Sequence, residues 1–189
     1  MRLVVLGSGS GGNAVAVSAG GVTLLLDAGF GPRTLMRRCE AAGIDVASIV
    51  GIVLTHEHGD HTRGAKGIAR RVRCPVYASR GTLAALAAKI GSVTCVPLRS
   101  HHTTAVGPFQ IAACPTTHDA AEPLAVTVTG PNRRAKVGLA YDLGRPTAAV
   151  RYMLRDATCL LVEANHDEVM LRTSAYPPVV RPTSSMGLN

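Results

Sequence analysis

The 189-residue sequence contains no tryptophan, and aromatic residues make up only 3% of it. Proteins that bind single-stranded nucleic acids without sequence preference stack the bases on aromatic side chains. This chain is therefore poorly supplied for base stacking. Any contact that it makes with a nucleic acid is expected to depend on the phosphates.

Long apolar runs are missing as well. No segment approaches the run of about 20 apolar residues that a membrane-spanning helix needs. The N-terminus offers only the short run Leu3–Leu6, whereas the apolar core of a secretory signal takes roughly 7–15 residues. We therefore expect a cytoplasmic protein with no membrane partner.

Paired cysteines are absent too. The five cysteines are widely spaced, and no two of them form a C-x-x-C pair. This pattern argues against a disulfide framework and predicts reduced, mostly buried thiols.

Lysine is scarce in a strongly basic chain. Lys66, Lys89 and Lys136 are the only lysines among 20 basic residues, which leaves 17 arginines and a net charge of +8. Guanidinium groups bind phosphate in a planar, bidentate way, so the composition favours an anionic substrate. A genome biased toward arginine and alanine would produce the same composition, and the two explanations carry equal weight.

Residues 54–61 read Leu-Thr-His-Glu-His-Gly-Asp-His and directly follow an apolar run that predicts a buried strand. His56 and His58 are two residues apart, so on an extended backbone they point the same way. Gly59 lets the chain turn Asp60 and His61 toward a second position. Imidazole and carboxylate ligands suit zinc, and manganese or iron where oxygen ligands dominate. This one loop is predicted to serve two ions about 3.5–4 Å apart.

Two other motif interpretations fail on spacing. His56-Glu57 begins the H-E-x-x-H pattern of helical zinc proteases, but Asp60 stands at the fifth position. The glycines of residues 7–12 match G-x-G-x-x-G, which opens a helix in dinucleotide-binding proteins. Residues 13–26 predict two strands instead, which leaves no room for that helix.

Hydrophobic periodicity and turn signals predict an α/β chain. Strands are predicted at residues 2–6, 13–17, 22–26, 49–54, 75–78, 94–97, 110–114, 124–129, 135–140 and 158–162. Helices are predicted at residues 32–42, 64–72, 79–91 and 147–154, and the histidines at 101 and 102 are assigned to a surface loop. With 47% hydrophobic residues, one core can form, so a single domain is expected over residues 1–189.

Six short motifs follow one another along the chain. They are Gly-Ser-Gly-Ser-Gly-Gly-Asn at 7–13, Leu-Asp-Ala-Gly-Phe at 26–30, the histidine-rich stretch at 54–61, Thr-His-Asp-Ala at 117–120, Tyr-Asp-Leu-Gly at 141–144 and Glu-Ala-Asn-His-Asp at 163–167. In this order they resemble the metallo-β-lactamase fold superfamily, and in detail its YycJ/WalJ-like hydrolases. The resemblance implies an αββα metallo-β-lactamase-type sandwich, with two mixed β-sheets flanked by helices.

The resemblance also implies two divalent metal ions, zinc or manganese. One ion would be bound by His56, His58 and His118. The other would be bound by Asp60 and His61, with Asp142 as a carboxylate that bridges both ions and screens their repulsion.

Three further roles follow from the resemblance. Asp27 would support the metal-binding loop through hydrogen bonds. Asp60 and His166 are the catalytic candidates. For His166, proton donation to the leaving oxygen and a purely structural role are both open.

The chain departs from the subgroup's pattern after Pro177. The subgroup continues through a Gly-His-Leu-Ser-Asn motif whose histidine completes the second metal position, whereas residues 187–189 read Gly-Leu-Asn. We therefore expect an incomplete C-terminal part, weaker binding of the second ion, and exposed apolar surface beside the predicted strand 158–162. A truncated product, a degraded gene and a chain that relies on a partner are all open explanations.

The expected function is that of a metal-dependent hydrolase, a phosphodiesterase or nuclease with 5'-3' exonuclease-like action on DNA or RNA through a metal-activated water. The same pair of ions also activates water against carbonyl groups, so hydrolysis of a lactone, thioester or β-lactam is the alternative. An inactive, truncated metal-binding remnant is the alternative from outside the enzymes.

Overall fold

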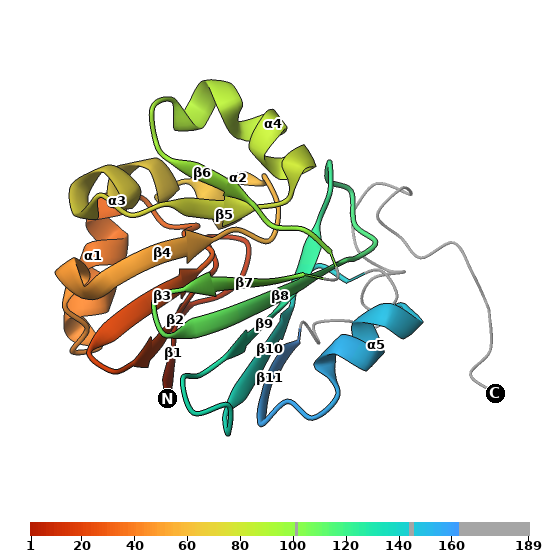
Figure 1. The fold of residues 1–189 in the computed structure, drawn as a ribbon. Coiled ribbons are helices and arrows are strands. Elements are labelled where there is room, and N and C mark those ends of the chain that lie inside the picture. The colour runs from red at the N-terminus through yellow and green to blue at the C-terminus, as the bar shows by residue number, and fades with distance from the viewer. Residues whose placement is uncertain (101, 144–145, 163–189) are drawn as a thin grey trace, which may run out of the picture.

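Two β-sheets packed face to face form the centre of the computed structural model, which describes residues 1–100, 102–143 and 146–162 (Figure 1). The first sheet is mixed, with its first three strands antiparallel and the later ones parallel. Its strands, in spatial order, are β1 (Arg2–Gly7), β2 (Ala14–Ala19), β3 (Val22–Leu26), β4 (Ile49–Val53), β5 (Val76–Ala78) and β6 (Cys95–Pro97).

The second sheet is also mixed. Its strands, in spatial order, are β11 (Cys159–Val162), β10 (Lys136–Ala140), β9 (Leu124–Thr129), β8 (Phe109–Pro115) and β7 (Thr103–Val106). The pair β10–β11 is parallel, and the other pairs are antiparallel. The crossover between β10 and β11 passes through a helix, as a parallel connection requires.

The inner faces of the two sheets share one apolar core. Alternate residues of a strand point to opposite faces, so Leu24 and Leu26 of β3 face the second sheet while Leu25 faces outward. From the second sheet, Phe109 and Ile111 meet them in the same cluster. All five side chains are completely buried, so β3 at the middle of the first sheet carries buried apolar residues on both faces.

Helices cover both outer faces, which confirms the predicted αββα sandwich (Figure 1). The first sheet carries α1 (Pro32–Ala41), α3 (Ala65–Val72) and α4 (Arg80–Ile90), and the second carries α5 (Ala148–Leu154). Capping explains where two of them begin. Ser79 Oγ accepts a hydrogen bond from Thr82 N at 3.0 Å, and Thr147 Oγ1 accepts one from Val150 N at 3.2 Å.

The structure differs from the predicted elements in three places. Strand β7 lies where no strand was predicted. Its two threonines make its sequence weakly apolar, so local pattern does not identify it as a strand, but it pairs with β8 across a tight turn at Gly107. The predicted helix 64–72 begins only at Ala65, and the short helix α2 (Gly59–Thr62) precedes it. A 3-10 turn, η1 (Val46–Ser48), leads into β4. His102 is exposed as predicted, and His101 lies outside the described residues.

The direction of the strands brings distant loops to one edge of the sandwich. Strands β3 and β4 are parallel, so the loops after them lie side by side. Strands β8 and β10 each run antiparallel to β9 and therefore run in the same direction as each other. The two sheets are joined at this edge, where Leu124 N donates a hydrogen bond to Thr55 O at 2.9 Å. Every predicted metal-binding residue before residue 163 follows one of these strands.

Strand β11 ends the described part of the second sheet. Its side chains Leu160 and Val162 are 50% and 47% exposed, in the region where exposed apolar surface was expected. The residues after Val162, including His166 and the divergent C-terminal stretch, lie outside the described residues. Within the described part of the chain, no helix has the length and apolar character needed to cross a membrane.

Candidate metal centre

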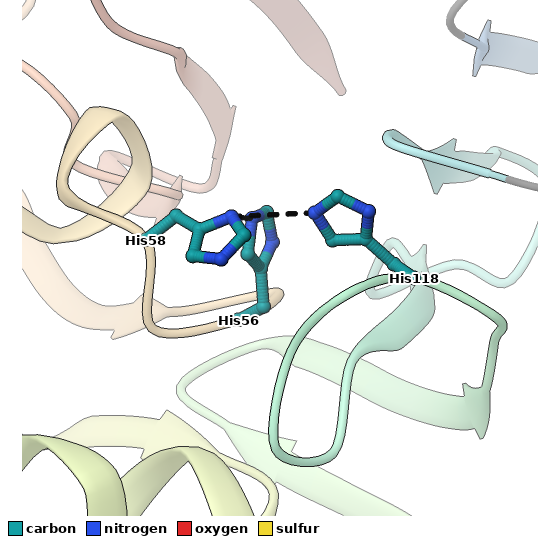
Figure 2. Close-up of side chains that lie close together, drawn as sticks. All are labelled: His56, His58 and His118. Carbon is teal, nitrogen blue, oxygen red and sulfur yellow. Dashed lines mark hydrogen bonds between the residues drawn. The ribbon is translucent and has the colours of Figure 1, made fainter. Parts of the chain in front are cut away.

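Three histidines from two loops converge at the edge of the sandwich (Figure 2). His56 and His58 lie on the loop after β4, and His118 lies on the loop after β8. His56 Nε2 is 3.1 Å from His58 Nδ1, and His58 Nδ1 is 3.3 Å from His118 Nε2. The structure thus brings together the three histidines that were predicted to bind one ion.

The spacing of these nitrogens fits a metal ion. Zinc–nitrogen distances are about 2.0–2.1 Å, and in a tetrahedral site two such ligands lie roughly 3.3–3.4 Å apart. The observed distances of 3.1 and 3.3 Å are close to that edge length. Three imidazoles facing one point also form a donor set that zinc and other first-row metals accept.

A second group of donors shares His56 with the first. It contains His56, His61 and Asp142, whose ligand atoms all lie within 4.8 Å of one another. Asp142 Oδ2 is 3.1 Å from His61 Nε2 and 3.7 Å from His56 Nε2. Asp142 therefore stands between histidines predicted for different ions, the arrangement that a bridging carboxylate requires.

Asp60 is placed differently from the other predicted ligands. Its Oδ2 atom lies 3.5 Å from His61 Nε2, yet Asp60 belongs to neither group of converging donors in the described residues. Its side chain is 32% exposed, whereas that of His61 is 1% exposed. Asp60 thus lies at the solvent side of the centre and His61 at its buried side.

Asp27, the residue expected to support the metal-binding loop, lies at the base of the centre. Its carboxylate is fully buried and accepts hydrogen bonds from Thr55 N at 2.8 Å and from Thr55 Oγ1 at 2.9 Å. His61 Nδ1 is 2.8 Å from Asp27 Oδ2. Because Nδ1 faces Asp27, Nε2 is the nitrogen that His61 turns toward Asp142. A carboxylate behind a histidine is the usual way in which proteins orient a metal ligand.

The two buried histidines differ strongly in proton affinity. Burial and the neighbouring charge of His61 lower the pKa of His56 to about 3, although Asp142 opposes them. Burial also acts to lower the pKa of His61, but Asp142 and Asp27 outweigh it and raise that pKa to about 10. The hydrogen bond with His61 lowers the pKa of Asp142 to about 2, against the effect of burial. The centre thus stabilises positive charge between its two carboxylates.

The glycine-rich N-terminal loop supports the centre through contacts that the sequence did not reveal. Asn13 N donates to Asp60 O at 2.7 Å, and Asn13 Nδ2 lies 3.1 Å from His61 Nε2. Gly29 N donates to Asn13 O at 2.9 Å. A Cβ at Gly29 would collide with the Asp60 carbonyl, so only glycine lets the two loops pack this closely.

Glu57 is a second contributor that sequence reasoning missed. Glu57 Oε1 accepts a hydrogen bond from Ala121 N at 2.6 Å, three residues after His118. Its other oxygen, Oε2, accepts a bond from Thr82 Oγ1 of α4 at 3.4 Å. Glu57 therefore ties the loop that carries His118 to the loop that carries His56 and His58. Its position between two histidines in the sequence carried no signal for this role.

The family comparison agrees with the arrangement. Residues 23–184 match the family model described as "Beta-lactamase superfamily domain". The chain is 32% identical over 183 residues to an exodeoxyribonuclease YycJ of Bacillus anthracis, covering 94% of this chain and 67% of that protein. It is 27% identical over 177 residues to an exodeoxyribonuclease WalJ of Streptococcus pneumoniae serotype 2, covering 91% and 65%. The chain thus spans about two thirds of the length of these relatives.

Solved structures share the fold at low sequence identity. The metallo-beta-lactamase fold protein YhfI from Bacillus subtilis aligns with a TM-score of 0.68 and 17% identity, over 84% of this chain and 68% of that one. The Rm3 metallo-beta-lactamase aligns with a TM-score of 0.65 and 19% identity, over 85% and 74%. Fold, converging donors and matched motifs together show that this chain belongs to the metallo-β-lactamase superfamily, within its YycJ-like subgroup.

Proposed function

We propose that the chain is a metal-dependent phosphodiesterase that acts on nucleic acid, with exodeoxyribonuclease-like activity of 5'-3' direction. The observation that carries the proposal is the pair of overlapping donor groups, which share His56 and contain Asp142 between them. Two relatives named as exodeoxyribonucleases support DNA as the substrate. The net charge of +8 supports a phosphate-rich substrate over a neutral one.

The donor groups suit two divalent ions, zinc or manganese. We assign His56, His58 and His118 to the first ion, and His61 and Asp60 to the second, with Asp142 between the ions. Such ions supply Lewis-acid chemistry, because they polarise phosphoryl oxygens and make water acidic near neutral pH. The second ion is expected to bind more weakly, because Asp60 is partly exposed and lies outside the converging groups.

The protein's own side chains would orient the reaction. Asp60 is the carboxylate at the solvent side, 3.5 Å from both Asn13 Nδ2 and His61 Nε2. From there it would accept a hydrogen bond from the attacking water and hold that water toward the phosphorus. The buried pair of Asp27 and His61 keeps the opposite wall rigid. His166, which lies outside the described residues, stays the candidate for protonating the leaving oxygen.

A substrate panel tests the proposal. The protein is supplied with zinc or manganese and offered bis-p-nitrophenyl phosphate, DNA and RNA labelled at either end, and a chromogenic β-lactam. We expect hydrolysis of the phosphodiesters, release of labelled nucleotides first from the 5' end of DNA, and no turnover of the β-lactam. A chelator should stop the reaction, because the donor groups cannot activate water without a bound metal ion.

The panel also identifies the alternatives. Turnover of the β-lactam alone would replace the nuclease by a carbonyl hydrolase built on the same centre. Internal cuts in DNA would retain the phosphodiesterase but remove the exonuclease assignment. No turnover of any substrate by protein that elemental analysis shows to contain metal would favour the inactive metal-binding remnant.

A further inference from the structure

A basic cavity borders the metal-binding loop at Gly59 and Thr62. It has a volume of about 290 Å³ and lies among α2, α3 and α4. Its lining combines Gly59, Thr62, Arg63, Ala65, Lys66, Leu86, Lys89 and Ile90. Neither the metal centre nor the proposed reaction uses this cavity, and two of the chain's three lysines line it.

The charge of the cavity has one sign. Arg63, Lys66 and Lys89 are exposed cations, and no carboxylate is among the described lining residues. None of the three forms an ion pair with an acidic residue in the part of the chain that the structure describes. Arg63 Nη1 donates a hydrogen bond to the Gly11 carbonyl oxygen at 3.3 Å, which leaves its charge uncompensated. Three cations that line one cavity without a paired carboxylate favour the entry of an anion.

The cavity and the metal centre share a wall. Gly59, which lines the cavity, stands between His58 and Asp60 in the chain. Thr62, another lining residue, donates a hydrogen bond from Oγ1 to the His58 carbonyl oxygen at 2.9 Å. A chain-like ligand lying over this loop reaches both places, whereas a small ligand reaches only one.

The lining suits a sugar–phosphate backbone better than a lone ion. Leu86, Ile90 and Ala65 are buried apolar residues at the base of the cavity, while the cations lie at its rim. The volume is at the lower end of the range of pockets that hold small organic molecules. Phosphate contacts by lysine and arginine need no aromatic platform, which agrees with the absence of tryptophan.

We propose that this cavity, with Arg63, Lys66 and Lys89 at its rim, binds the phosphodiester backbone of a single nucleic-acid strand beside the metal centre. The inference rests on the proposed function for its ligand. Its residues take no part in bond cleavage and contribute to strand binding alone. Because they contact phosphates and not bases, binding here is independent of sequence.

A double variant tests the cavity without touching the metal centre. Lys66→Gln with Lys89→Gln removes two rim charges and keeps the length of both side chains roughly constant. Binding of a fluorescein-labelled single-stranded DNA is measured by anisotropy in the presence of a chelator, over a series of salt concentrations. We expect Kd to rise roughly tenfold at low salt, and the slope of log K against log salt to decrease by about 1.4, because each lost contact releases about 0.7 fewer counter-ions.

The matched control removes the same charge elsewhere. Arg37→Gln with Arg70→Gln takes two exposed cations from α1 and α3 outside the cavity. Its Kd and salt slope should stay within about twofold of the parent protein. Equal losses in the two double variants would overturn the proposal, because the effect would then be one of net charge. Failure of the parent protein to bind the strand at all would overturn it too.

Two further measurements distinguish a strand site from a site for free phosphate, and failure of the cavity proposal from failure of the catalytic proposal. Inorganic phosphate competing as well as an unlabelled oligonucleotide, per mole of phosphate, would mean a site for free anions and would contradict a strand site. Hydrolysis of bis-p-nitrophenyl phosphate should be the same in the parent and both double variants. If no substrate is hydrolysed while the cavity variant still loses strand affinity, the catalytic proposal fails and the cavity proposal stands. If DNA is hydrolysed with unchanged KM in the cavity variant, the cavity proposal fails and the catalytic proposal stands.

Discussion

At the scale of single residues, Asp27 is not a predicted metal ligand, yet its hydrogen bonds position both Thr55 and His61. It adopts a left-handed backbone with φ of 57°, which is uncommon for a residue with a side chain. Asp142, at the end of β10, has a similar φ of 47°. One aspartate from each sheet thus bends away from its strand sharply, and both meet His61. Such strain persists only where surrounding contacts maintain it.

We predict that Asp27→Asn weakens metal binding by roughly 10–100-fold, because the amide no longer accepts a charge-assisted bond from His61 Nδ1. Competition with a chromophoric chelator measures the affinity for zinc and manganese. Asp45→Asn is the control, since the exposed Asp45 side chain accepts a bond from Ala47 N at the start of η1 and belongs to neither donor group. An unchanged affinity in Asp27→Asn would show that His61 is oriented by other contacts.

The histidine at the centre of the first group gives a sharper prediction. His58 Nδ1 contacts both His56 Nε2 and His118 Nε2, so His58→Ala should abolish hydrolysis and lower metal content while leaving the circular dichroism spectrum unchanged. His102→Ala is the matched control, because His102 is exposed and belongs to neither donor group. Full activity in His58→Ala would place the chemistry elsewhere.

At the scale of elements, loops from both sheets are tied across the site. Glu57 bonds Ala121 N, and Glu122 Oε2 accepts a bond from Gly81 N at 2.7 Å at the start of α4. Thr82 Oγ1 also donates to Glu122 O at 3.5 Å. Side-chain hydrogen bonds therefore tie the loop between β8 and β9 to the first sheet's half of the molecule. These ties determine where His118 stands relative to His56 and His58.

We predict that Glu57→Ala lowers the affinity of the first ion by about fivefold, because a hydrogen bond worth roughly 1 kcal/mol no longer positions the His118 loop. Glu57→Gln keeps an acceptor oxygen and should retain most of the affinity. Isothermal calorimetry with zinc measures both. Equal losses in the two variants would point to the charge of Glu57 and not to its bond with Ala121.

At the scale of the whole molecule, two buried thiols make stability depend on pH. Burial is the main cause that raises the pKa of Cys39 and of Cys74 to about 11. In the unfolded chain both thiols have a pKa near the ordinary value of 9.0. The two protonated thiols therefore favour the folded state fully below pH 9, and this contribution is lost as pH rises from 9 through 11. Over that range the unfolded state releases protons that the folded state keeps.

We predict that raising the pH from 8 to 10 lowers the free energy of unfolding by about 1 kcal/mol for each thiol, in addition to changes from other groups. Urea unfolding, followed as one transition if residues 1–189 form one domain, measures the change. Stopping at pH 10 limits the contribution of Tyr77 and Tyr141, whose pKa values burial also raises. The Cys39→Ala, Cys74→Ala double variant should lose less stability over this range. The same decrease in the free energy of unfolding from pH 8 to pH 10 in both proteins would refute the assignment of this pH dependence to Cys39 and Cys74.

Much of the fold was accessible from local sequence. Strand β3 has the predicted bounds Val22–Leu26, and α4 (Arg80–Ile90) lies one residue inside the predicted helix 79–91 at each end. Periodicity and capping act within a few residues, so a single sequence contains them. Strand β7 was missed because its pairing with β8 stabilises it more than its own weakly apolar pattern indicates. The sandwich itself came from the resemblance of ordered motifs.

The sequence by itself indicated candidate metal ligands at residues 54–61 behind a buried strand, because histidine spacing and the apolar run before it are local properties. His118 and Asp142 became candidates only through the resemblance. Only the tertiary structure decided how those residues are grouped. It joined His56 to both donor groups, left Asp60 at their solvent side, and placed Glu57 against Ala121, 64 residues away. Such contacts depend on how two sheets pack and which strands run in the same direction. No pattern within one segment of the chain encodes that relation.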